Sequence, residues 1–265
     1  MTEKRVVYRL PGMDAVTVRR DVEYRQTETG ALTMDVYSPA ESKAPAPAVL
    51  FVTGYPDAGF QKMLGCKLKE MGSYVSWGQL AAASGLAAVT YENQDPAADA
   101  FEVLRYVRRN AASLGIDGDR IGVWSCSGNV PTALSVLMQE SQDFLRCAVL
   151  CYGIMLDLDG STGVAGSAAQ WRFANPTAGR SVEDFPPGLP LFIARAGRDE
   201  FPHLNESIDR FMVKALARNL PVTLVNHAEA PHAFDIVQDN ETTREIIRQI
   251  LAFLRFHLAA QPGGG

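Results

Sequence analysis

The stretch "RIGVWSCSGNVPTAL" (Arg120–Leu134) changes character at its centre. An apolar run rich in β-branched residues ends in a tryptophan, and the small polar side chains of Ser125-Cys126-Ser127 follow it. After a Gly-Asn pair the apolar residues resume at a spacing typical of a helix. This pattern predicts a strand, a sharp turn and a helix, with a nucleophilic side chain exposed at the turn.

Three residues of this turn carry a nucleophilic group, and packing distinguishes them. At such an elbow the residues two positions before and after the nucleophile must be small, because the strand and helix backbones pass close together there. Ser127 satisfies the rule with Ser125 and Asn129, since asparagine tolerates unusual backbone conformations better than most residues. Cys126 would place Trp124 at a small position, and Ser125 would place a valine there. The sequence therefore favours Ser127.

The rest of the chain alternates between apolar runs and helical patterns. Two alternating segments near the N-terminus, 16–25 and 32–40, predict an antiparallel hairpin at the edge of a sheet. Continuous apolar runs indicate strands buried on both faces; they lie at 49–53, 86–93, 120–124, 147–153, 189–196 and 221–227. Helical patterns separate these runs, at 75–84, 99–115, 129–140, 203–220 and 241–258. We therefore expect an α/β fold, in which an eight-stranded, mostly parallel sheet carries helices on both faces.

Residues 155–187 do not follow this alternation, because they are rich in glycine and proline. Long insertions of this kind usually form a lid or a binding loop, and we expect this one to cover the site. We treat 1–265 as a single domain. We expect residues 261–265, in the sequence "QPGGG", to form a disordered tail.

Polar residues that suit a catalytic triad follow two of the predicted strands. A serine nucleophile needs a base, and the base needs a carboxylate that orients it. Asp199 follows the strand in "LFIARAGRDEFP", and His232 follows the next one, in "VTLVNHAEAPHAFD". The carboxyl ends of parallel strands meet at one edge of the sheet, so these side chains are expected near Ser127.

The motifs "VLFVTGYPDAG", "DRIGVWSCSGN", "AGRDEFP" and "APHAFD" resemble those of the α/β-hydrolase superfamily, over about residues 49–258. The chain looks most like the esterase and dienelactone-hydrolase-like branch. The resemblance implies Ser127 as nucleophile, Asp199 as acid and His232 as base. Ser125 and Asn129 depart from the glycines usual in the family, and dienelactone hydrolases proper have cysteine where this chain has Ser127.

The resemblance also implies an oxyanion hole, which is the set of hydrogen-bond donors that stabilises the tetrahedral intermediate. Gly128, directly after the nucleophile, is expected to contribute one backbone N–H. Tyr55 in "TGYPD" aligns with the second glycine of the His-Gly-Gly found in many relatives, and is expected to contribute the other. Pro56 has no N–H to offer.

The function implied is a serine hydrolase that cleaves small carboxylic esters through an acyl-enzyme. A lactonase, a dienelactone-hydrolase-like enzyme or an acyltransferase on the same triad remains open. A non-catalytic binding protein on the same scaffold also remains open, because a fold alone does not guarantee a function. We expect neither a metal nor an organic cofactor.

Other residues compete for these roles. His227 is the main rival base, while His203 and His257 are expected to be structural or surface residues. Glu200 adjoins Asp199 but sits one position past the Gly-Arg-Asp pattern. Asp235 is expected to be a turn or cap residue. Four aromatic residues are candidates either for the core or for an acyl pocket; they are Trp77, Tyr152, Trp171 and Phe173.

Bulk properties narrow the class of protein. Of the 265 residues 47% are hydrophobic, and the formal net charge of −5 argues against nucleic acid or an anionic membrane as the main partner. The first ten residues lack the apolar stretch of a secretory signal, and no apolar run is long enough to span a bilayer. We expect a soluble cytoplasmic protein that acts on a small-molecule ester, and a homodimer is left open. The four cysteines form no CxxC pair, which predicts free, buried thiols.

Overall fold

The computed structural model describes residues 2–40, 45–140 and 143–259. Its centre is an eight-stranded sheet in the order β1-β2-β4-β3-β5-β6-β7-β8. Antiparallel pairing joins β1 to β2 and β2 to β4, and all other neighbours are parallel. The predicted eight-stranded, mostly parallel sheet is therefore confirmed. The strands span Thr17–Thr27 (β1), Gly30–Ser38 (β2), Ala46–Phe51 (β3), Ala87–Tyr91 (β4), Ile116–Cys126 (β5), Leu145–Cys151 (β6), Leu191–Ala196 (β7) and Val222–His227 (β8).

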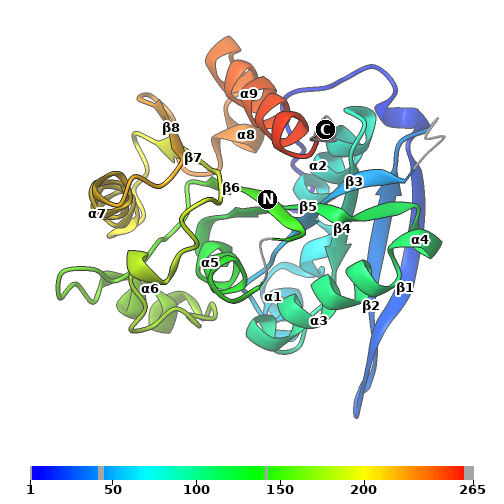
Figure 1. The fold of residues 1–265 in the computed structure, drawn as a ribbon, viewed down its shortest axis with the longest axis horizontal. Helices are drawn as coiled ribbons and strands as arrows, with labels where there is room; N and C mark the ends of the chain where they lie inside the picture. Colours follow the sequence, from blue (N-terminus) through cyan, green and yellow to red (C-terminus); the bar gives the residue numbers. More distant parts are fainter. Residues whose placement is uncertain (1, 41–44, 141–142, 260–265) are drawn as a thin grey trace, which may run out of the picture.

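Helices cover both faces of this sheet, with α2 and α9 on one side and α3 and α5 on the other (Figure 1). Alternate strand residues supply the two cores, because successive side chains point to opposite faces. Leu50 and Leu150 pack in the core beneath α3 and α5, while their neighbours Val49 and Val149 pack beneath α2 and α9. The helices span Asp57–Leu64 (α1), Gly72–Ala83 (α2), Pro96–Arg109 (α3), Ala111–Leu114 (α4), Val130–Gln139 (α5), Gly163–Trp171 (α6), Leu204–Ala217 (α7), Phe234–Val237 (α8) and Glu241–His257 (α9).

The structure differs from the sequence pattern in several places, two of which concern helices and the insertion. The single helix expected over 99–115 is divided into α3 and α4 at Asn110, which leaves helical geometry at φ −106° and ψ 14°. Segment 155–187 is not a plain loop, since it contains α6 and the 3-10 turn η4 (Val182–Asp184). The predicted tail 261–265 lies outside the described residues.

A buried lysine connects the hairpin edge of the sheet to the segment between α1 and α2. Lys69 lies in the 3-10 turn η2 (Leu68–Glu70), and its side chain is only 3% exposed. Its ammonium group lies 2.6 Å from Asp21 on β1, 3.1 Å from Asp35 on β2 and 3.3 Å from Glu92 after β4. Several carboxylates are needed to compensate the desolvation of one buried ammonium, so this cluster fixes η2 against the sheet.

Candidate active site

The strand β5 ends in a strained turn at Ser127. The residues Ser127–Asn129 form the 3-10 turn η3, and α5 begins at Val130. Ser127 has φ +56°, in the left-handed region that non-glycine residues rarely adopt. Such strain costs about 1–3 kcal/mol and is concentrated at functional sites. It exposes the serine hydroxyl at the carboxyl edge of the sheet.

Three side chains form a hydrogen-bonded series at this edge. The Oγ of Ser127 lies 2.9 Å from Nε2 of His232, and Nδ1 of His232 lies 2.7 Å from Oδ2 of Asp199. Asp199 follows β7 and its side chain is fully buried, while His232 precedes α8 and its side chain is 22% exposed. When the Nδ1 proton is donated to Asp199, Nε2 is free to accept the serine proton. The structure thus brings together the three residues that the sequence selected.

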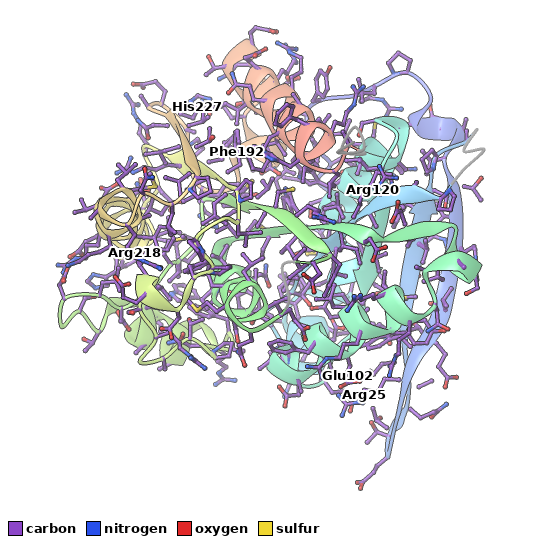
Figure 2. The ribbon with its side chains drawn as sticks, viewed as in Figure 1. Arg25, Glu102, Arg120, Phe192, Arg218 and His227 are labelled. Carbon is purple, nitrogen blue, oxygen red and sulfur yellow. The ribbon has the colours of Figure 1, made fainter. Side chains whose placement is uncertain are left out.

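The rival groups lie elsewhere. His227, beside the end of β8 and α9 (Figure 2), is buried and within hydrogen-bond distance of Thr243, 3.2 Å away. His203 is exposed and pairs with Glu206, and the ring of His257 packs on α9. Among the described histidines, His232 alone contacts Ser127.

The two residues that flank the elbow, Ser125 and Asn129, form different hydrogen bonds. Ser125 is fully buried, and its hydroxyl donates to the carbonyl oxygen of Val52 at 3.0 Å. Asn129 has φ −82° and ψ −19°, so tolerance of an unusual backbone does not explain its presence. Its side chain instead accepts from the Gly54 N–H at 2.7 Å and donates to the Cys126 carbonyl at 3.0 Å. Asn129 therefore ties the loop after β3 to the elbow.

Gly128 is required by close packing. A Cβ at this position would lie 2.5 Å from the Tyr55 hydroxyl oxygen and 2.7 Å from a ring carbon of Phe173. The structure thus places the Tyr55 side chain, as well as its backbone, next to the elbow. Within the described residues the Tyr55 hydroxyl has no hydrogen-bond partner, and burial raises its pKa to about 12, so it stays protonated at neutral pH.

A cavity of about 320 Å³ opens beside Ser127 and His232. Its outer wall comes largely from 60–71, the segment of α1 and η2 that the sequence did not single out. From segment 155–187 the cavity receives only Trp171, which packs edge-on against Phe201 at 5.3 Å between ring centroids. Of the aromatic candidates, Trp77 and Tyr152 also line it.

The thiol next to the elbow stays protonated. Burial raises the pKa of Cys126 to about 12, which removes the thiolate needed for nucleophilic attack at neutral pH. All four cysteines are free, as the sequence predicted, but only Cys147 and Cys151 are fully buried, while Cys66 and Cys126 are partly exposed. Of the three candidate side chains at the elbow, Ser127 is the one whose hydroxyl lies within hydrogen-bond distance of a histidine.

Two further properties describe the site and its surroundings. In residues 2–40, 45–140 and 143–259, no group of three or more His, Cys, Asp and Glu side chains is placed to hold a metal ion. No helix in the same ranges is both long and apolar enough to cross a bilayer.

Solved structures resemble this chain over nearly its whole length. An esterase from the Planctomycetes species Thermogutta terrifontis has a TM-score of 0.68 and 20% identity, over 96% of this chain and 97% of that one. A bacterial heroin esterase has a TM-score of 0.69 and 15% identity, over 96% and 88% of the two chains. The chain has the α/β-hydrolase fold.

The three hydrogen-bonded residues occupy loops at one edge of this α/β-hydrolase fold, after β5, β7 and β8. The Thermogutta terrifontis esterase has also been solved phosphorylated by paraoxon, with a TM-score of 0.66 and 20% identity over 96% of this chain and 100% of that one. No protein-family model and no curated protein matches the chain. The resemblance to the dienelactone-hydrolase-like branch stays a prediction.

Proposed function

We propose that this protein is a serine hydrolase of small carboxylic esters. The observation that carries the proposal is the hydrogen-bonded series of Ser127, His232 and Asp199 at the mouth of an apolar cavity. The solved neighbours named as esterases support the same class of reaction.

The reaction follows from the geometry. His232 takes the proton of Ser127 through Nε2 while the serine oxygen attacks the ester carbonyl carbon. Asp199 holds the imidazole in the required tautomer and stabilises the imidazolium. His232 then gives the proton to the leaving alcohol, which leaves the acyl group on Ser127. In the second half of the reaction His232 takes a proton from water, the water oxygen attacks the acyl carbon, and His232 returns the proton to the Ser127 oxygen as the acid is released.

The negative oxygen of the tetrahedral intermediate needs donors. We assign the backbone N–H groups of Gly128 and Tyr55 to this role, because Gly128 follows the nucleophile and Tyr55 is held beside it by the loop that Asn129 anchors. We also propose that 155–187 acts as a lid, whose contact with the substrate is made through Trp171.

A fluorophosphonate probe tests this function, because it labels only an activated serine. We expect peptide mapping to find the label on Ser127. Ser127→Ala should abolish labelling and lower ester hydrolysis by several orders of magnitude, while the neighbouring Cys126→Ala should keep most of the activity. Hydrolysis that survives in Ser127→Ala but is lost on alkylation of Cys126 would refute the assignment.

A further inference from the structure

The wall of the cavity contains a buried carboxylate that forms no ion pair with a lysine or arginine among the described residues. Of the most deeply buried acids, Asp35, Glu92 and Asp99 each form an ion pair with lysine or arginine. Asp57 and Asp235 form none with any described residue. Asp235 is the one of these two that lines the cavity. An uncompensated buried charge is costly, and sites that keep one are often functional.

Asp235 is held rigidly by two neutral donors. Its Oδ1 accepts from the Tyr152 hydroxyl at 2.6 Å, and its Oδ2 accepts from the Trp77 indole N–H at 2.7 Å. These bonds fix the direction of the carboxylate without balancing its charge. Burial raises the pKa of Asp235, as expected for a carboxylate that lacks a cationic partner.

The surrounding cavity wall is aromatic. Tyr74, Trp77, Trp124 and Tyr152 lie at its inner end, and the rings of Trp77 and Trp124 are 5.3 Å apart. None of the described residues that line the cavity is lysine or arginine. Aromatic faces attract ammonium groups within about 6 Å, by about 2 kcal/mol where water is excluded. The wall therefore offers a cation both aromatic rings and a counter-ion.

This end of the cavity is close to the reacting groups. The Tyr152 ring lies 5.0 Å from the His232 ring, and its hydroxyl reaches Asp235, so a single tyrosine spans the gap between them. Cys126, adjacent to the nucleophile, is near enough to Asp235 for the carboxylate to help raise its thiol pKa. A group bound against Asp235 would thus be a few bonds from an ester carbonyl held at Ser127.

We propose that the cavity binds esters that carry an ammonium group, with Asp235 as the counter-ion of that group. This inference rests on the proposed function and names its substrate class. The ammonium group supplies the positive charge that the buried carboxylate lacks. The aromatic walls replace part of the hydration shell that the ammonium group loses on binding.

The test compares two esters of the same shape, acetylcholine and 3,3-dimethylbutyl acetate, in which carbon replaces the charged nitrogen. We expect the wild-type protein to prefer acetylcholine by about tenfold or more in kcat/KM. Asp235→Asn keeps the shape of the side chain, and it should lower the kcat/KM of acetylcholine much more than that of the neutral ester, which removes most of this preference. Equal use of both esters by the wild type, or an equal loss for both in Asp235→Asn, would overturn the proposal.

Asp57→Asn provides the matched control. Asp57 is also buried without an ion pair, but it accepts the N–H groups of Leu68 and Asn93 outside the cavity lining. Its replacement should leave the preference between the two esters unchanged. An equal loss of preference in this variant would refute the specific role of Asp235.

A second measurement needs no variant. Tetramethylammonium chloride should competitively inhibit wild-type hydrolysis of 4-nitrophenyl acetate more strongly than either sodium chloride or 3,3-dimethyl-1-butanol does. Inhibition no stronger than that of the neutral alcohol would contradict the proposal. An absence of any ester hydrolysis and of fluorophosphonate labelling would instead refute the proposed function itself.

Discussion

Replacing Asn129 by glycine would restore the residue usual in the family that this elbow resembles, and we expect it to destabilise the protein. Asn129 has a right-handed backbone that does not need glycine. Its side chain bonds the Gly54 N–H, the Cys126 carbonyl and the Tyr74 hydroxyl, at 2.7, 3.0 and 3.2 Å. Asn129→Gly would remove all three bonds.

The size of the loss follows from these contacts. Leaving the buried Gly54 N–H without an acceptor costs about 1–3 kcal/mol. The added backbone freedom of glycine costs about 0.5–1 kcal/mol more. The sum of about 1.5–4 kcal/mol corresponds to a fall in Tm of about 3–16 °C for a chain of this length. The loop that carries Tyr55 should also loosen, so we expect kcat to fall more than stability alone would explain.

Thermal unfolding followed by circular dichroism measures the first effect, and Asn219→Gly is the matched control. Asn219 has φ +56° after α7 and is exposed, so glycine relieves strain there. That variant should be as stable as the wild type or more stable. Our reasoning fails if Asn129→Gly unfolds at the wild-type temperature, or if both variants lose stability equally.

Three further outcomes are expected. His232→Ala should lower hydrolysis of an activated ester by about 10³-fold or more. His227→Ala, once shown to be folded, should retain this activity. The reverse result would identify His227 as the base. Trp171→Ala should widen the cavity mouth and shift kcat/KM towards longer acyl chains, which a series of 4-nitrophenyl esters measures; an unchanged profile would exclude a lid contact. Burial raises the pKa of Asp57 from 3.8 to about 6, so the protonated form favours folding, and the contribution of Asp57 to stability should decline by about 3 kcal/mol as pH rises from about 4 to above 6. Denaturant unfolding at pH 4 and pH 7 should show that the decline is larger in the wild type than in Asp57→Asn by about this amount.

The sheet and the three hydrogen-bonded residues could be predicted because their signals are local. Runs such as "VLFV" are apolar throughout and rich in β-branched residues, which is typical of a strand covered on both faces. Ser127, Asp199 and His232 each follow such a run, and parallel strands bring their carboxyl ends to one edge. Proximity at that edge thus follows from the order of elements alone.

The cavity could not be predicted, because its walls meet over long distances in the chain. Helix α1 is only eight residues long and lacks a side-chain N-cap, so no sequence pattern predicts it. Asp235, expected as a turn or cap residue, is instead bonded to Trp77, 158 positions away, and to Tyr152, 83 positions away. The spacing of apolar residues along the sequence does not predict contacts over such distances.

The cluster around Lys69 has a consequence for how the substrate range of this protein can change. The lysine adjoins Leu68, a residue of the cavity wall, yet its partners Asp21 and Asp35 belong to the hairpin at the far edge of the sheet. A substitution in that hairpin would therefore move the cavity wall without touching any residue near Ser127. In directed evolution towards new esters, beneficial changes should arise at these remote acids, in combination with changes at Lys69.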